Sequence, residues 1–162
     1  MMHPVPLKLW KEFIQPEWID FNKHMNVAYY TLVFDHAVDA FFNYIELGRE
    51  YRKVTTGSTF AVEHHIQYNR ELVEGDEVFV ESLLIGFDEK RLHHYHEMYN
   101  VHGDYLAATC EFLSLHVDLK TRRVTPIPEN KIGRIYDICL AHKSNPKNIN
   151  LGNKIKVSKS AN

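Results

Sequence analysis

Residues 27–47 are mostly apolar, and their polar side chains recur at steps of three or four: Thr31, Asp35, Asp39, Asn43 and Glu46. This spacing places the polar side chains on one face of an α-helix. The pattern therefore predicts a helix of roughly five to six turns with a single narrow polar stripe. Because the rest of its surface is apolar, another part of the protein must wrap most of it. Asn26 is placed to cap this helix and Gly48 to end it.

Alternation of apolar and polar side chains predicts strands elsewhere. Five segments show it: residues 7–14, 59–69, 77–87, 91–101 and 105–117. Pro16 ends the first strand, and the short turns DEKR and HGD join the last three as antiparallel hairpins. Within residues 59–69, alternation assigns a dry face to Phe60, Val62, Ile66 and Tyr68 and a wet face to Glu63, His65, Gln67 and Asn69.

The C-terminal part of the chain predicts one more helix, over residues 129–142, with Pro128 near its start. Residues 143–162 are expected to form a polar, loosely ordered tail with a short edge strand at KIKV. Residues 1–142 then form one domain with an α+β fold, in which an antiparallel sheet of about five strands wraps one long central helix. Such a sheet leaves part of the helix uncovered, so we expect a homodimer or homotetramer.

Composition argues against several classes of protein. A chain of 162 residues has room for one ordinary domain, and its net charge of −2 gives no reason to expect a nucleic-acid partner. The N-terminus MMHPVPLKLWKEF lacks the features of a signal peptide, and no stretch approaches the length of a membrane span. We therefore expect a cytoplasmic protein without a membrane partner, in which Cys110 and Cys139 are buried thiols.

Three polar residues, Asp20, Asn22 and His24, directly precede the long helix. Unpaired backbone N–H groups and the helix dipole make a helix N-terminus favourable for an anion, so the N–H of Val27 could stabilise the oxyanion that forms from a thioester or ester. Asp20 could then act as nucleophile or general base, Asn22 could orient a water or the carboxylate, and His24 could transfer a proton or hold Asp20. The alternative is that all three are ordinary capping residues.

The stretch PEWIDFNKHMNVAYY, followed by the helix and by IQYNRELVEGDEV, resembles hotdog-fold acyl-CoA thioesterases of the 4-hydroxybenzoyl-CoA thioesterase type. The spacing Asp-x-Asn-x-His-x-Asn-x-x-Tyr is also similar to that of plant acyl-ACP thioesterases. Within this group the chain is most similar to the betainyl-CoA thioesterases associated with carnitine breakdown. The resemblance covers about residues 7–125.

This resemblance implies hydrolysis of a small acyl-CoA thioester, with CoA as part of the substrate and no further cofactor. Asp20 matches the catalytic carboxylate of the family, Asn22 and His24 match the asparagine and histidine of the acyl-ACP type, and Val27 supplies the backbone N–H at the thioester oxygen. Tyr30 matches an aromatic residue of the first helical turn, for which core packing is the better explanation.

Two positions depart from the family pattern. Lys23 stands where many members have glycine, which leaves the conformation of the loop open. The glutamate that acyl-ACP thioesterases carry on the next strand aligns with Gln67, with Glu63 as an alternative.

Other residues suggest binding functions. As a set, Arg70, Arg122 and Arg123 are candidates for the phosphates of CoA, although for each one taken singly a solvated turn charge is the better explanation. Histidines at 64, 65, 93, 94 and 96 suggest a metal, but no ligand motif is complete, so we expect no metal site and interpret them as strand residues on a half-wet face. The aromatic residues near the polar cluster could line an acyl pocket, and could hold a quaternary ammonium group by cation–π attraction: Trp18, Phe21, Tyr29 and Tyr30.

Two other functions remain open. Hotdog enoyl-CoA hydratases share the fold, but their aspartate and histidine are five apart with a proline between, whereas Asp20 and His24 are four apart. A noncatalytic protein that binds acyl-CoA or another small ligand would not need a carboxylate facing a thioester.

Overall fold

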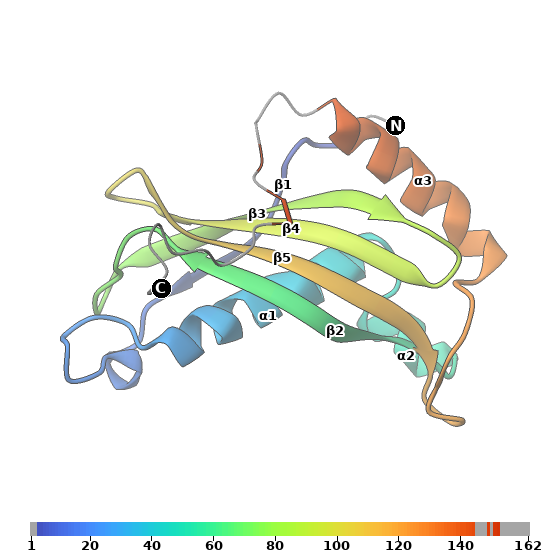
Figure 1. Ribbon diagram of the computed structural model, residues 1–162, viewed down its shortest axis with the longest axis horizontal. Helices are drawn as coiled ribbons and strands as arrows, with labels where there is room; N and C mark the ends of the chain where they lie inside the picture. Colours follow the sequence, from blue (N-terminus) through green and yellow to red (C-terminus); the bar gives the residue numbers. More distant parts are fainter. Residues whose placement is uncertain (1–2, 145–148, 150, 153–162) are drawn as a thin grey trace, which may run out of the picture.

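A curled antiparallel sheet wraps helix α1 (Val27–Tyr44) in the computed structural model, which describes residues 3–144, 149 and 151–152 (Figure 1). The sheet has six strands in the order β1-β3-β4-β5-β2, and the short β6 pairs with β5. The predicted α+β fold is confirmed. The other elements follow in chain order: β1 (Leu7–Phe13), the 3-10 helix η1 (Pro16–Trp18), α2 (Arg49–Val54), β2 (Gly57–Tyr68), β3 (Glu77–Phe87), β4 (Arg91–Asn100), β5 (Tyr105–Asp118), β6 (Arg123–Val124) and α3 (Glu129–Lys143).

Helix α1 starts where predicted and ends three residues early. Asn26 is its N-cap, and its last residue is Tyr44 instead of Leu47. Glu46 adopts a left-handed φ of 63°, which ends the helical turn. Gly48 is the N-cap of α2, a short helix that the sequence pattern did not predict. The polar stripe is confirmed, because Asp35, Asp39 and Asn43 are exposed while the opposite side packs on the sheet.

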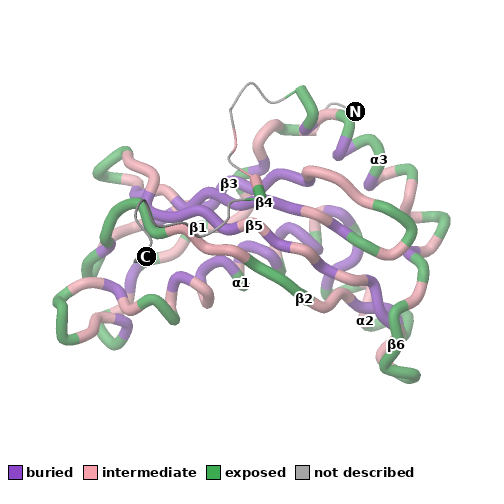
Figure 2. The backbone as a smooth tube through the Cα atoms, in the orientation of Figure 1, coloured by how far each residue is buried: buried purple, intermediate pink, exposed green. Residues whose placement is uncertain are grey.

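Strand β2 differs from the predicted two-faced pattern because it contains a β-bulge. The register shifts between Ala61 and Glu63, so Phe60 pairs with Leu115 and lies on the outer face of the sheet, opposite to Ile66. Val62 is 53% exposed, and residues 61–64 are exposed on both faces (Figure 2). β2 forms one edge of the described sheet, and the middle of this edge is open.

Helix α3 covers the part of β3 that β1 does not reach, at the edge of the sheet opposite to β2. β1 pairs with β3 only as far as Ser82. Beyond it, the backbone N–H of Leu84 donates to Nδ1 of His142 on α3 at 2.8 Å, and Nε2 of His142 lies 3.2 Å from the Pro4 carbonyl. This pair of contacts requires a neutral imidazole with its proton on Nε2. Burial lowers the pKa of His142, in agreement with that state.

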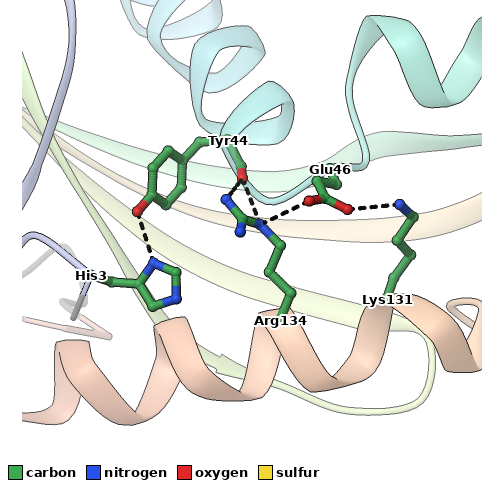
Figure 3. Close-up of polar contacts among 5 residues, drawn as sticks. All are labelled: His3, Tyr44, Glu46, Lys131 and Arg134. Atoms are coloured by element: carbon green, nitrogen blue, oxygen red, sulfur yellow. Dashed lines mark hydrogen bonds and ion pairs between the residues drawn. The ribbon is translucent and has the colours of Figure 1, made fainter. Parts of the chain in front are cut away.

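Basic side chains of α3 also cap the end of α1 (Figure 3). The Arg134 guanidinium donates twice to the Tyr44 carbonyl, from Nε at 3.1 Å and from Nη2 at 2.8 Å. Glu46 accepts from Lys131 at 2.8 Å, and Arg134 lies 3.4 Å from its other oxygen. Cations at a helix C-terminus satisfy its free carbonyls and oppose the negative end of the dipole. The sheet, α1 and α3 are therefore held together at this end.

Two histidines are buried at the centre of the core, which corrects their prediction as residues of a half-wet face. His94 and His96 lie on the inner face of β4 and are 0% exposed. Their rings are joined by a 2.7 Å contact from Nδ1 of His94 to Nε2 of His96, and serines close both ends of the chain: Ser82 at 2.8 Å from His96 and Ser114 at 3.0 Å from His94. The sheet register pairs His96 with Ser82. Every ring nitrogen of the two histidines has a hydrogen-bond partner, which offsets the free-energy cost of burying polar groups.

Three further observations concern earlier expectations. Cys110 and Cys139 are buried free thiols, as predicted. The predicted tail lies almost wholly outside the described residues, as does the strand expected at KIKV, although the Gly152 N–H donates to Glu111 at 2.8 Å. Within the described part of the chain, no helix combines the length and the apolar character needed to cross a membrane.

The buried histidines predict that the protein loses stability in mild acid. Burial lowers the pKa of His94 well below its usual value, lowers that of His96 to about 3, and also lowers that of His142. An unfolded imidazole titrates near pH 6.5, so below that pH the unfolded chain binds more protons than the folded one, and stability falls as the pH falls. Between about pH 7.5 and 5.5 we expect His94 and His96 each to reduce the free energy of unfolding by about 1 kcal/mol in urea titrations, and His142 to act in the same direction.

A matched variant separates the effect of these histidines on stability from that of carboxylates, which also bind protons in acid. The double substitution His94→Phe with His96→Leu removes two of the three titrating side chains, and the difference in stability between the two pH values should shrink. Equal stability of the wild-type protein at both pH values would contradict the assignment of neutral buried imidazoles.

Candidate active site

The loop before α1 is a tight turn whose backbone is fixed by three hydrogen bonds. Within the turn the Asp20 N–H donates to the His24 carbonyl at 3.1 Å, and the Lys23 N–H donates to the Asp20 carbonyl at 2.9 Å. Outside it, Met25 N–H donates to the Leu72 carbonyl at 2.7 Å and so ties the loop to the segment after β2. Residues 20–24 are therefore fixed relative to the first turn of α1.

Lys23, which stands where the resemblance implies a glycine, has a left-handed φ of 64°. A left-handed conformation costs a residue with a side chain roughly 1–2 kcal/mol, whereas glycine adopts it freely. The chain thus keeps in this loop a conformation that suits glycine. The lysine therefore adds strain at this residue, but the turn stays closed by the hydrogen bond from its N–H to the Asp20 carbonyl.

The Asp20 carboxylate is held by one donor on each oxygen. Oδ1 accepts from the Asn22 backbone N–H at 2.8 Å, and Oδ2 accepts from the Asn26 side-chain amide at 3.3 Å. The other end of the same amide, Oδ1 of Asn26, accepts from the Ala28 N–H at 3.0 Å and caps the helix. The carboxylate is thereby anchored to the N-terminus of α1.

The N–H of Val27 is distinct among its neighbours. The backbone N–H groups of Met25, Asn26, Ala28 and Tyr29 all donate to protein acceptors. For Val27 we find no acceptor within the part of the chain that the structure describes, and the residue is 56% exposed. An unpaired, accessible N–H at the positive end of a helix can accept a developing negative charge.

A cavity of about 200 Å³ opens beside Val27 and collects four of the predicted site residues: His24, Val27, Tyr30 and Arg70. Tyr68, on the inner face of β2, also lines it and meets Tyr30 edge to face, with ring centroids 5.1 Å apart. Burial raises the pKa of Tyr30 to about 12, so its hydroxyl stays neutral. The sequence suggested Tyr30 for this place but not Tyr68.

His24 and Asn22 are placed differently from Asp20. His24 lines the cavity, and its Nδ1 lies 3.3 Å from the Met25 carbonyl. Its only described hydrogen bond with Asp20 is made by the His24 backbone carbonyl, so the residue that holds the carboxylate is Asn26. The side chain of Asn22 is exposed at the tip of the turn.

The three arginines are not together within one chain. Arg70 follows β2 at the cavity, where its guanidinium lies 4.1 Å from the centroid of the Tyr105 ring. Arg122 lies over Phe60, near the opposite end of the same strand, with a centroid distance of 5.1 Å, and Arg123 is next to it. Twelve residues of β2 separate the two ends by about 35 Å.

The strand residues considered for the family's glutamate lie on the outer face of the sheet. Gln67 pairs with Thr109 and Glu63 pairs with Leu113, on the side away from α1. A cavity of about 690 Å³ also opens near Glu63, His65, His93 and Glu111, far from the first turn of α1. Across the described ranges no three histidine, cysteine or acidic side chains are grouped so that they could hold a metal.

Comparisons with known proteins show the family to which this chain belongs. Residues 14–134 match the family model described as the thioesterase-like superfamily. The betainyl-CoA thioesterase of Pseudomonas aeruginosa is 35% identical over 133 residues, covering 82% of this chain and 84% of that protein. The L-carnitine dehydrogenase/betainyl-CoA thioesterase of Agrobacterium fabrum is 37% identical over 76% of this chain, which spans only 25% of that longer protein.

Solved structures extend the similarity to the whole fold. A Staphylococcus aureus protein solved in complex with CoA has 27% sequence identity and a TM-score of 0.81, with coverage of 96% of this chain and 98% of that one. The hotdog arrangement expected from the sequence is confirmed.

The strain at Lys23 yields a prediction in which the sign of the effect is informative. At most positions alanine is more stabilising than glycine, because glycine loses more backbone entropy on folding. At a φ of 64° the order should reverse, so Lys23→Gly should be more stable than Lys23→Ala by about 1 kcal/mol. Denaturant unfolding of both variants measures the difference, and neither retains the lysine charge. A more stable alanine variant would show that the turn is not left-handed at this residue.

Proposed function

Because this chain belongs to the thioesterase-like superfamily and is an acyl-CoA thioesterase, we propose that Asp20 activates or makes the attack on the thioester and that the Val27 N–H binds the oxyanion. The observation that carries this proposal is the position of the Asp20 carboxylate, held by Asn26 at the end of α1 where the Val27 N–H is unpaired. Attack and stabilisation of the resulting charge can therefore occur at one place.

Two routes use these groups. As a general base, Asp20 takes a proton from water while the water oxygen bonds to the thioester carbon, and the carbonyl oxygen becomes an anion at Val27. The C–S bond then breaks, and CoA leaves as a thiol after gaining a proton. As a nucleophile, Asp20 bonds to the carbonyl carbon itself, CoA leaves, and water hydrolyses the resulting anhydride. Both routes yield a free acid and CoA.

We assign supporting functions to the neighbouring polar residues. His24 faces the cavity next to Val27, so its ring is placed to give a proton to the departing CoA sulfur. Asn22 fixes one oxygen of Asp20 with its backbone N–H, and its exposed side chain can orient a water. No cofactor is needed, since CoA enters as part of the substrate.

The acyl group we propose is small and cationic, such as the betainyl group that the relatives' names describe. The cavity has a volume of about 200 Å³, and the rings of Tyr30 and Tyr68 form part of its wall with Glu71 nearby. Aromatic faces attract a quaternary ammonium by cation–π interaction. Trp18 and Tyr29 instead stack on each other at 5.3 Å, and Phe21 is 92% exposed.

A CoA substrate and two buried free thiols fit a cytoplasmic location.

We also propose that the protein is a homodimer joined through β2. Residues 61–64, which are exposed, lie at the centre of this twelve-residue edge strand, so a two-fold axis there would pair each end with the opposite end of the partner's strand. Arg122 of the partner subunit would then lie beside Tyr68 and Arg70. Two arginines, one from each copy, suit the phosphates of CoA.

Thiol release from a panel of acyl-CoA thioesters tests the reaction. We expect betainyl-CoA to be hydrolysed and Asp20→Asn to be at least about 100-fold slower in kcat, since removal of a general base or nucleophile costs that much or more. Glu17→Gln, which neutralises an exposed carboxylate in the adjacent η1, serves as the control and should keep wild-type activity. A hydratase or a noncatalytic binding protein would release no CoA from any substrate, and full activity of Asp20→Asn would refute the mechanism.

Light scattering and kinetics test the dimer together. Val62→Lys places a charge on the proposed seam and should give a monomer, whereas Val54→Lys, at a residue 82% exposed on α2, should not change the mass.

Arg70→Ala and Arg122→Ala should each raise KM about tenfold, the loss expected for one charge-assisted hydrogen bond. A dimeric Val62→Lys protein would place the interface elsewhere, and an unchanged KM in Arg122→Ala would remove that residue from the substrate site.

A further inference from the structure

Asn26 uses both ends of its side-chain amide, and the two ends serve different groups. Its Oδ1 accepts from the Ala28 N–H at 3.0 Å, which is the capping contact. Its Nδ2 donates to Oδ2 of Asp20 at 3.3 Å, which capping does not require. One planar group therefore links the helix end to the carboxylate.

Capping alone does not explain an amide at this position. Serine and aspartate cap a helix about as well as asparagine, because only an acceptor oxygen is needed. Neither offers the N–H donor that reaches Asp20, and aspartate would set a second negative charge beside it. The donor end of Asn26 is thus the chemically specific part of the side chain.

The donor also determines how the Asp20 carboxylate is presented. The Asn22 N–H holds Oδ1 and the Asn26 amide holds Oδ2, so both oxygens have a fixed partner and the plane of the carboxylate cannot turn freely. Each oxygen keeps a second lone pair for a proton or for attack. Because the same Asn26 amide is bonded to Ala28, any shift of the helix end moves Asp20 with the Val27 N–H.

We infer that Asn26 is a positioning residue for the reaction, which orients the Asp20 carboxylate toward the substrate bound at Val27. This inference rests on the proposed role of Asp20. It separates two functions of one side chain, the structural cap and the support of the reacting group, and predicts that they can be lost independently.

Two substitutions keep the capping oxygen and remove the amide donor: Asn26→Ser and Asn26→Asp. We expect both proteins to fold with thermal midpoints within a few degrees of wild type, because the acceptor oxygen is retained. In Asn26→Ser kcat should fall about tenfold with little change in KM, because the amide donor that fixes the orientation of the Asp20 carboxylate is lost. In Asn26→Asp kcat should fall further, since a like charge replaces the donor.

Asn43→Ser is the matched control, because the Asn43 side chain accepts from the Arg49 N–H at 2.7 Å at the far end of α1 and touches no part of the site. Its kcat and KM should equal those of wild type. Wild-type kcat in Asn26→Ser and Asn26→Asp, together with an inactive Asp20→Asn, would overturn the inference and leave the proposed function standing. An active Asp20→Asn would overturn both. A loss of kcat that appears only together with a large fall in the thermal midpoint would reduce Asn26 to a cap and would also overturn the inference.

Discussion

An apolar helix that must be buried along most of its length, yet open at its first turn, is the constraint on which this structure depends. Seven residues of α1 are buried against the sheet and its ends: Tyr30, Val33, Phe34, Ala37, Val38, Phe41 and Phe42. Burial of such side chains contributes about 1.5–3 kcal/mol each, so the sheet has to curl around the helix. The start of the first turn is not covered in this way: Val27 is exposed after the loop of residues 20–24, and its N–H has no acceptor among the described residues. The accessible N–H at this end of the helix is thus a consequence of where the wrapping stops.

The two ends of α1 are finished by opposite chemistry. At the N-terminus, Asn26 accepts from the backbone and presents the Asp20 carboxylate to the positive end of the dipole. At the C-terminus, Arg134 donates to the Tyr44 carbonyl and places a cation at the negative end. The second arrangement depends on α3, which also protects the edge of β3 through His142. Helix α3 therefore stabilises the end of α1 that takes no part in catalysis, and the fixed helix can serve as a reference for the reacting groups.

Much of the fold could be predicted because it follows from local periodicity. The four long strands and α3 lie within two residues of their predicted limits, since alternation and proline positions act on neighbouring residues. The errors arose where a distant partner decides the outcome. The bulge at Ala61 reverses the face of Phe60, and the burial of His94 depends on serines of two other strands. No pattern within β2 or β4 alone carries that information.

The site shows the same division between local and distant causes. Asp20, His24 and Val27 could be proposed as site residues from the sequence because their spacing and the helix start are both local. The contact of the Asn26 amide with Asp20 could not be predicted, since the sequence identifies a cap but not the direction of its amide nitrogen. The separation of Arg70 from Arg122 was equally hidden, because it depends on the length of β2 and on which end of the strand meets α1. Lys23 shows the converse: its side chain departs from the family pattern while its backbone takes the conformation that glycine favours. The path of the backbone in this loop is therefore what ties the Asp20 carboxylate, through Asn26, to the N-terminus of α1.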